Sequence, residues 1–214
     1  KTWIRKTRGT MNIDKNKISR LNNGESYIKH IQKHNLKSGI SDGSIIPTSD
    51  FSKIRDVDAL MICVPPPLDM EKNPDLSYVI STANEIKSHL RSSQLIILES
   101  TTYPGTTREI LKPILEESGL KSGTDIYIAF SPEREDPGNT EFTTKNIPKV
   151  VGGDGIVARD LTCILYDKIC AKTVPVSSLE VAEGVKLTEN IFRSVNIVMI
   201  NELKIMYDKM GINV

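Results

Sequence analysis

Residues 126–139 read IYIAFSPEREDPGN, an apolar run followed by charged residues between two prolines. The run from Ile126 to Phe130 is typical of a buried strand. Four consecutive charged residues, Glu133 to Asp136, follow the end of that strand. In open α/β sheets, ligands bind in the crevice beyond the carboxyl ends of the strands. The segment from Ser131 to Asn139 is therefore a candidate ligand-binding loop, although a solvated turn explains its charges equally well.

From about residue 59 onward, strand and helix patterns alternate along the chain. Strands are predicted at 59–64, 95–98, 126–130, 149–151 and 173–176, and helices at 75–90, 106–117 and 156–169. Asp75 is expected to cap the first of these helices, and Thr106 or Thr107 the second. Repeated βαβ units predict an α/β fold, an incomplete Rossmann-like parallel sheet with flanking helices. It is incomplete because the sequence contains no glycine-rich GxGxxG turn, and only Met11-Asn12-Ile13-Asp14 resembles the tail of a second strand.

After Pro175 the sequence predicts one long helix. Ser177 and Glu180 form a capping box, and only Gly184 interrupts the helical pattern before Gly211. A helix of about 33 residues is roughly 50 Å long at 1.5 Å per residue. This is long for a helix packed on a sheet, so we expect it to lead into a second, helical unit or to a partner subunit.

Composition and charge exclude several classes of protein. The chain has 214 residues, 38% hydrophobic and 26% charged, as in soluble globular proteins. Its net charge of +1 gives no sign of a nucleic-acid partner, and the basic first 20 residues are interpreted as a solvated tail or frayed element. No apolar run approaches the roughly 20 residues of a membrane span, and no signal peptide is visible. We therefore expect no membrane contact and a cytoplasmic location.

The three cysteines, Cys63, Cys163 and Cys170, are an odd number without metal-like spacing. We interpret all three as structural, with Cys63 as a buried thiol and the other two on a helix. No metal site is expected.

A second strand end carries residues suited to a ligand. Residues 99–107 read ESTTYPGTT, with five serine and threonine hydroxyls directly before a predicted helix N-terminus. Free N–H groups and the helix dipole favour an anion or a polarised water there. Simple capping needs only one of those hydroxyls, so a ligand site and an ordinary cap remain alternatives.

The long helix carries a third group of polar residues. Lys186, Asn190 and Arg193 are spaced so that they share one helix face. A cation and an amide directed at one oxygen stabilise a developing oxyanion. An ordinary solvated helix face is the alternative.

Together these segments resemble the UDP-glucose/GDP-mannose dehydrogenase family, and within it the bacterial UDP-N-acetylglucosamine 6-dehydrogenases. The resemblance spans about residues 11–214. It implies a partial NAD-binding, Rossmann-like domain at 1–176, and at 177–214 the long central helix that starts an α-helical dimerisation domain. The segments that carry it are ICVP at 62–65, NPDLSYV at 73–79, the two strand-end segments 99–107 and 131–139, PKVVGG at 148–153 and the stretch 176–202.

The resemblance implies an NAD-dependent, two-step oxidation of the C6 alcohol of a UDP-N-acetylhexosamine to the uronic acid, for surface polysaccharide synthesis. UDP-N-acetylglucosamine is the expected substrate. In this family a cysteine captures the aldehyde, and water hydrolyses the thioester that forms. By motif match, Thr101 positions water and Glu133 acts as general base or orients that water. Lys186 and Asn190 stabilise the oxyanion. Substrate contacts are implied for Glu133, Arg134, Lys186, Asn190, Arg193 and Asn196, and cofactor contacts for Asn12, Asp14, Lys17, Pro66 and Thr101.

Three features near the implied cofactor depart from the family: the glycine-rich turn, Asn12 and Pro66. The GxGYVG turn with which members open is absent. Asn12 stands where the family has its ribose-binding acid, and Asp14 replaces that acid only if the register shifts. Lys17 is implied near the adenosine end of NAD. Pro66 replaces a threonine that is usual in the loop after the Cys63 strand.

The catalytic cysteine of the family lies in a GGxC segment of a C-terminal domain, whereas this sequence ends at Val214. None of its cysteines lies in such a motif. We expect a fragment of the enzyme, inactive alone, with a UDP-sugar ligand and a homodimer formed through the long central helix. The alternative is a degenerate, non-catalytic protein that keeps dimerisation and partial nucleotide-sugar binding. A dehydrogenase of the 6-phosphogluconate class ranks below both, because it requires phosphate-sugar contacts in place of the 131–139 loop.

Overall fold

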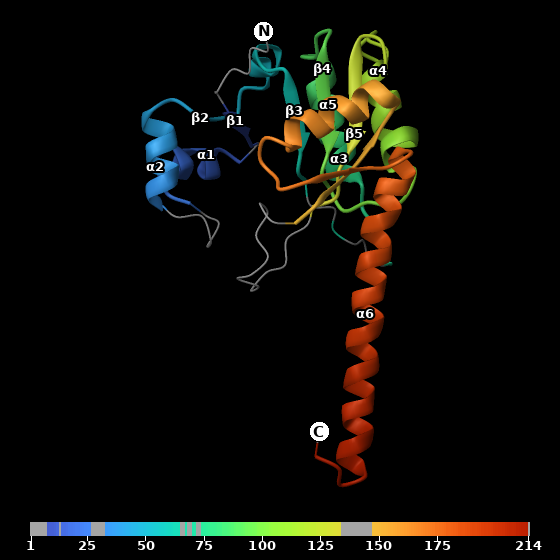
Figure 1. Cartoon of the computed structure of the whole chain (residues 1–214). Helices are drawn as coiled ribbons and strands as arrows, with labels where there is room; N and C mark the ends of the chain where they lie inside the picture. The colour runs from blue at the N-terminus through green and yellow to red at the C-terminus, as the bar shows by residue number, and fades with distance from the viewer. Residues whose placement is uncertain are drawn as a thin grey trace. The chain divides into compact units, whose positions relative to one another are not determined.

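The computed structural model describes residues 8–12, 14–26, 33–64, 67, 70–71, 74–133 and 147–213. The chain divides into two compact units, Lys1–Ile54 and Arg55–Val214. Each unit is described by itself (Figure 1).

The first unit contains a two-stranded parallel sheet with two helices. Strand β1 (Arg8–Met11) pairs with β2 (Ile45–Thr48), and α1 (Lys15–Asn22) and α2 (Lys33–Ser41) lie between them in sequence. Among its described residues, the buried apolar ones are Ile18, Leu21, Leu36 and Ile54. The early strand tail predicted at 11–14 corresponds to β1, which ends at Met11. The tail interpretation of the basic start is wrong over residues 8–20, which form β1 and α1.

The second unit contains a five-stranded sheet whose spatial order follows the sequence. The strands are β3 (Ala59–Ile62), β4 (Gln94–Leu98), β5 (Ile126–Phe130), β6 (Lys149–Gly153) and β7 (Thr173–Pro175). All five coincide with predicted strands, and the α/β fold is confirmed. β3, β4 and β5 are parallel, and so are β6 and β7, but β6 pairs antiparallel with β5. A parallel neighbour requires a crossover connection, usually a helix, and no helix was predicted between β5 and β6.

The sheet is covered on both faces. On one face, α5 (Ile156–Tyr166) crosses in front of the strands (Figure 1), and its Tyr166 packs in a core cluster with Leu95, Ile97, Ala129 and Val151. Because successive side chains on a strand alternate, Ile96, Leu98, Ile128 and Phe130 form the opposite face, and all are fully buried. The remaining helical elements of the unit are η1 (Phe51–Asp56), which begins in the first unit, α3 (Ser77–Lys87), the π-helix η2 (Thr106–Leu111) and α4 (Lys112–Glu116).

The long helix predicted after Pro175 is α6 (Leu179–Lys209), of 31 residues. Figure 1 shows it running away from the sheet. Only its first turns are buried, through Leu179, Ala182 and Glu183. The predicted capping box is wrong, because Ser178 is the N-cap and its Oγ accepts the Val181 N–H at 3.3 Å. Among the described residues, no helix combines the length and apolar character needed to cross a membrane.

A close approach between β6 and α6 depends on Gly152. A Cβ atom at this position would lie 2.4 Å from the Ser178 carbonyl oxygen and 2.9 Å from the Ala182 Cβ. The contact is with backbone, which cannot rotate away as a flexible side chain does. Gly152 therefore lets the first turn of α6 rest on the end of β6.

We expect Gly152→Ala to lower the free energy of unfolding by about 1–3 kcal/mol, since overpacking against backbone forces α6 or β6 to move. Gly184→Ala is the matched control, because a Cβ there meets only the Pro104 Cγ, at 3.9 Å. That change should raise the free energy of unfolding by about 0.5–1 kcal/mol through helix propensity. Urea denaturation measures both, and equal effects of the two substitutions would contradict this account.

Candidate functional site

The carboxyl ends of three strands meet at one edge of the sheet. Leu98 and Phe130 are register partners in β4 and β5, and the Ser131 N–H donates to the Leu98 carbonyl at 3.1 Å. On the other side of β4, the Val64 N–H donates to the Ser100 Oγ at 3.2 Å. The structure thus brings together the segments that follow β4 and β5, which the sequence singled out separately.

Helix α6 adds its polar face to this edge. The Lys186 Nζ donates to the backbone carbonyl of Glu133 at 2.6 Å, and both residues are partly buried. Asn190, one turn further along α6, is also partly buried, whereas Thr101 is exposed. The predicted pair of Glu133 and Lys186 is therefore in contact, through the main chain of Glu133.

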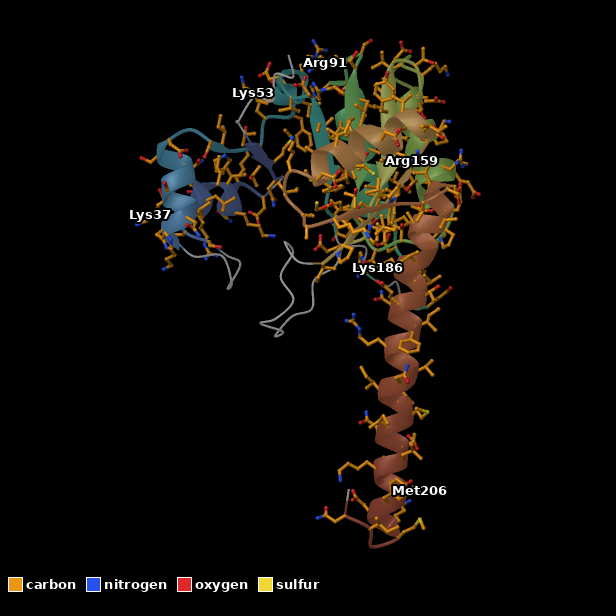
Figure 2. The ribbon with its side chains drawn as sticks, viewed as in Figure 1. Lys37, Lys53, Arg91, Arg159, Lys186 and Met206 are labelled. Atoms are coloured by element: carbon orange, nitrogen blue, oxygen red, sulfur yellow. The ribbon has the colours of Figure 1, made fainter. Side chains whose placement is uncertain are left out.

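The outer predicted substrate residues lie in less enclosed places. Arg193 is exposed on α6, and the amide of Asn196 donates to the Phe192 carbonyl at 2.7 Å within the same helix. Figure 2 shows Lys186 near the start of α6 and Met206 near its far end. Arg134 and Pro66 lie outside the described residues.

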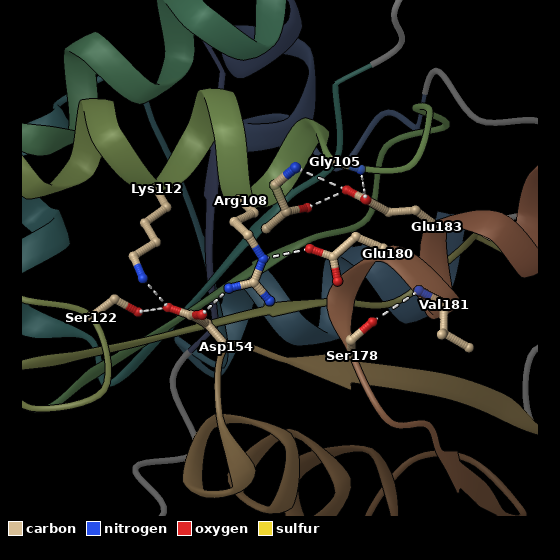
Figure 3. A network of polar contacts seen from close by, with 10 residues as sticks. Gly105, Arg108, Lys112, Ser122, Asp154, Ser178, Glu180, Val181 and Glu183 are labelled. Carbon is tan, nitrogen blue, oxygen red and sulfur yellow. Dashed lines mark hydrogen bonds and ion pairs between the residues drawn. The ribbon is translucent and has the colours of Figure 1, made fainter.

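The anion site predicted at the N-terminus of the helix after β4 is filled by the protein itself. The Glu183 carboxylate is fully buried and accepts the Gly105 N–H at 2.6 Å, the Thr107 N–H at 2.9 Å and the Thr107 hydroxyl at 2.6 Å (Figure 3). Neither threonine caps η2 with its side chain, because Gly105 is the N-cap and the Thr106 hydroxyl donates to the Tyr103 carbonyl. Burial raises the pKa of Glu183 above its ordinary value, and the hydrogen bonds from these three donors offset only part of that rise.

A second buried carboxylate, Glu99, lies at the end of β4. The Lys149 Nζ contacts Glu99 Oε1 at 2.8 Å, and both side chains are less than one-tenth exposed (6% and 8%). The Tyr166 hydroxyl donates to the same oxygen, and the Lys149 Nζ lies 5.0 Å from the Tyr166 ring centroid. Burial, followed by the charge of Glu99, raises the pKa of Tyr166. One carboxylate and one ammonium thus balance in the core beside the strand ends.

The cysteine predictions are partly wrong. Cys63 is exposed as a residue, although its thiol faces Glu99 Oε2 at 3.4 Å. Desolvation of the thiol and then the charge of Glu99 raise the pKa of Cys63 to about 12, so it stays protonated at neutral pH. Cys163 lies on α5, but Cys170 lies beyond its end; both pack against the core cluster.

The residues implied near the adenosine end of NAD lie in the first unit. Asp14 is the N-cap of α1, and its carboxylate accepts the N–H groups of Asn16 and Lys17 at 2.9 and 3.4 Å. The Asn12 side-chain oxygen accepts the Asp14 N–H at 2.9 Å. Lys17 is exposed on α1. Asp14 therefore serves local structure, and Asn12 is the side chain at the end of β1.

A charged network joins the start of α6 to its neighbours (Figure 3). Arg108 of η2 pairs with Glu180 of α6, and its Nη1 lies 3.0 Å from Asp154 Oδ1. Asp154 also contacts the Lys112 Nζ at 2.8 Å and the Ser122 hydroxyl at 2.7 Å. Glu180 thus contributes to this network instead of a capping box.

Sequence reasoning gave no role to Glu99, Lys149, Tyr166 or Glu183. A charged residue directly after the apolar strand QLIIL was the available signal for Glu99. For Glu183 the signal was its place beside Leu179 and Ala182 on the face that leads to Lys186. Within the part of the chain that the structure describes, no group of three histidine, cysteine or acidic residues is suited to a metal ion.

Two family models match this chain. The NAD binding domain of the UDP-glucose/GDP-mannose dehydrogenase family matches residues 9–170, and the central domain of that family matches residues 180–214. The chain belongs to the UDP-glucose/GDP-mannose dehydrogenase family. The resemblance stated from the sequence is confirmed.

Relatives of this family member include enzymes named for N-acetylated sugars. A UDP-N-acetyl-D-glucosamine 6-dehydrogenase from Pseudomonas aeruginosa is 34% identical over 94% of this chain and 47% of its own length. The solved UDP-D-ManNAc dehydrogenase of Pyrococcus horikoshii has a TM-score of 0.89 at 31% identity, over 96% of this chain and 49% of that chain. A ternary complex of GDP-mannose dehydrogenase from Pseudomonas aeruginosa has a TM-score of 0.88 at 26% identity, over 96% and 48%. The chain spans about half the length of these relatives.

We expect the Glu180–Arg108 pair to stabilise this dehydrogenase-family chain at neutral pH and to fail in acid. The hydrogen bond from Arg108 lowers the pKa of Glu180 to about 2, from an ordinary value of 4.5. Because the folded pKa is the lower one, the contribution is complete above about pH 4.5 and is lost as pH falls toward 2. Since the pair is partly exposed and screened, Glu180→Gln should cost only about 0.5–1 kcal/mol at neutral pH.

Urea denaturation at a series of pH values and salt concentrations measures this effect. The difference between the native chain and Glu180→Gln should shrink as the pH falls below 4.5, and also in high salt. A difference that stays constant over both series would contradict the assignment.

Proposed function

We propose that this chain is the NAD- and sugar-binding part of a UDP-N-acetylhexosamine 6-dehydrogenase that oxidises the C6 alcohol of UDP-N-acetylglucosamine to the uronic acid, for surface polysaccharide synthesis. The names of the relatives support this reaction and this class of sugar. The observation that carries the proposal is the contact between Lys186 of α6 and the Glu133 carbonyl at the end of β5. A cation and a carboxylate-bearing residue therefore meet beyond the carboxyl ends of the strands, and this supports a ligand site there, because ligands bind in that region of open α/β sheets.

The proposed roles follow from the chemistry of each side chain. Lys186 and Asn190 stabilise negative charge on the oxygen at the sugar C6. The Lys186 Nζ contacts the backbone oxygen of Glu133. The Glu133 carboxylate is proposed to orient water or to accept its proton. Thr101 offers an exposed hydroxyl at the neighbouring strand end. Arg193 and Asn196, further along α6, and Arg134 are proposed substrate contacts.

NAD, when bound, accepts hydride from the sugar, and the residues of this chain fit it only in part. The family model for an NAD binding domain matches residues 9–170. The side-chain oxygen of Asn12 is already engaged by the Asp14 N–H. An asparagine also brings no charge to a ribose hydroxyl. We therefore propose weak NAD binding by this chain.

The chain by itself is proposed not to turn over. A thiolate, not a thiol, captures an aldehyde, and burial raises the pKa of Cys163 and Cys170 while Cys63 has a pKa of about 12. With UDP-N-acetylglucosamine and NAD, the purified chain should produce no NADH above background. Sustained NADH production would contradict this expectation and leave the reaction class supported.

We expect the chain to form a homodimer through α6, because the part of this helix beyond Lys186 exposes many apolar residues. Ile191, Val195, Met199, Met206 and Met210 are each more than two-fifths exposed and recur at three- to seven-residue spacings. Sedimentation equilibrium should show a dimer that Met199→Glu weakens and that Lys204→Ala, on another face of the helix, leaves intact. A native chain that stays monomeric at all concentrations would contradict the proposal.

UDP-N-acetylglucosamine should bind this chain through Lys186. Lys186→Ala is expected to weaken binding about tenfold, since a charge-assisted contact contributes about 1.4 kcal/mol. Lys204→Ala is the matched control, because that lysine lies further along the same helix and pairs with Asp208. Isothermal titration calorimetry measures both, with UDP-glucose as the comparison sugar. Equal binding by native chain and Lys186→Ala would overturn the proposed site.

NAD should bind more tightly when position 12 carries an acid. Asn12→Asp keeps an oxygen for the Asp14 N–H and adds a charge-assisted contact to a ribose hydroxyl, so Kd should fall about fivefold. Asn16→Asp, an exposed position on α1, is the control that adds the same charge elsewhere. Fluorescence titration with NADH measures the change. An equal gain from both substitutions would show a general charge effect and contradict a ribose contact.

A further inference from the structure

Glu183 connects α6 to the turn that follows the β4 end. Its two carboxylate oxygens accept three donors, the N–H groups of Gly105 and Thr107 and the Thr107 hydroxyl, at 2.6–2.9 Å. The residue is fully buried, so water does not compete for these contacts. They fix both the height and the rotation of the helix, because the two oxygens are held by different residues of the turn.

Lys186 lies three residues after Glu183 and therefore on the same side of α6, about 4.5 Å along the helix axis. It makes the contact to the Glu133 carbonyl at the β5 end. Gly152 of β6 provides a third point of approach, against Ser178 and Ala182. Within two turns, α6 is thus held against the segments that follow β4 and β5 and against β6 itself. Beyond Lys186, the helix is mostly exposed.

A carboxylate is an unfavourable group to bury at the position of Glu183. Burying its charge costs free energy that three hydrogen bonds only offset. Glutamine has the same size as glutamate and carries no charge. If the side chain at position 183 only filled space, glutamine would therefore serve there equally well. Glutamine, however, replaces one acceptor oxygen by an NH₂ group. That group would face the Gly105 N–H or the Thr107 donors, and the two donors would push the helix away.

We infer that Glu183 is a positioning residue for the sugar site: it sets the register of α6 so that Lys186 reaches the Glu133 segment. The inference rests on the proposed function. A helix residue advances about 100° per position, so a slip of one position would turn Lys186 and Asn190 off the crevice. Glu183 acts through Lys186 and itself touches no substrate.

The test is a double-mutant cycle on UDP-N-acetylglucosamine binding, measured by calorimetry. Glu183→Gln should weaken binding about fivefold in the native background, and by less than about twofold in a Lys186→Ala background. The matched control is Glu202→Gln, an exposed glutamate further along α6, which should change neither affinity. Circular dichroism verifies that each variant is folded. If Glu183→Gln does not fold, Thr107→Val replaces it in the cycle, because it removes one donor and keeps the side-chain size.

The outcomes separate this inference from the proposed function. A Lys186→Ala variant that binds normally overturns the proposed site, and the inference with it. If Lys186→Ala weakens binding but Glu183→Gln does not, only the inference fails. Equal losses from Glu183→Gln in both backgrounds would show a general structural effect and also overturn it. Loss in the native background alone supports the positioning role.

Discussion

The position at which α6 leaves the sheet depends on the buried carboxylate of Glu183, which accepts hydrogen bonds from backbone N–H groups. A charge removed from water needs donors in fixed positions, and the turn at Gly105 and Thr107 supplies them. Once that contact is made, the first turn of α6 lies against β6, where Gly152 has no side chain to oppose it. As a result, the polar face of α6 with Lys186 lies at the strand ends. The candidate site is thus a consequence of how one helix is anchored.

The strands could be predicted because their signal is local. Runs such as QLIIL and IYIAF are apolar on both faces, and both faces of the sheet are buried. Strand direction is different, since an apolar run of five residues gives the same pattern in either direction. The sequence predicted a parallel sheet, so the reversal of β6 was not predicted. The only signal for it was the lack of a predicted helix between β5 and β6. The cap at Ser178 was missed because neighbouring serines at 177 and 178 are chemically equivalent choices.

The site shows a similar division. Helical spacing predicted correctly that Lys186 and Asn190 share a face, and motif match named Glu133 as a partner. The partners of buried charged side chains cannot be predicted from helical spacing or motif match. Glu183 finds Gly105 across 78 positions of sequence, and Tyr166 finds Glu99 across 67. Periodicity shows which face of an element is buried, but the donor or cation opposite a buried carboxylate depends on how distant elements pack.

The antiparallel pairing of β6 with β5 has a consequence for how such a site changes. A chain that reverses direction returns to the edge of the sheet it has just left, so the connection between β5 and β6 begins and ends beside the same crevice. Glu133 and Lys149 stand at its two ends. Residues can be added to or removed from that connection without shifting the register of any strand. The length of this connection and the geometry of the sheet are therefore independent of each other.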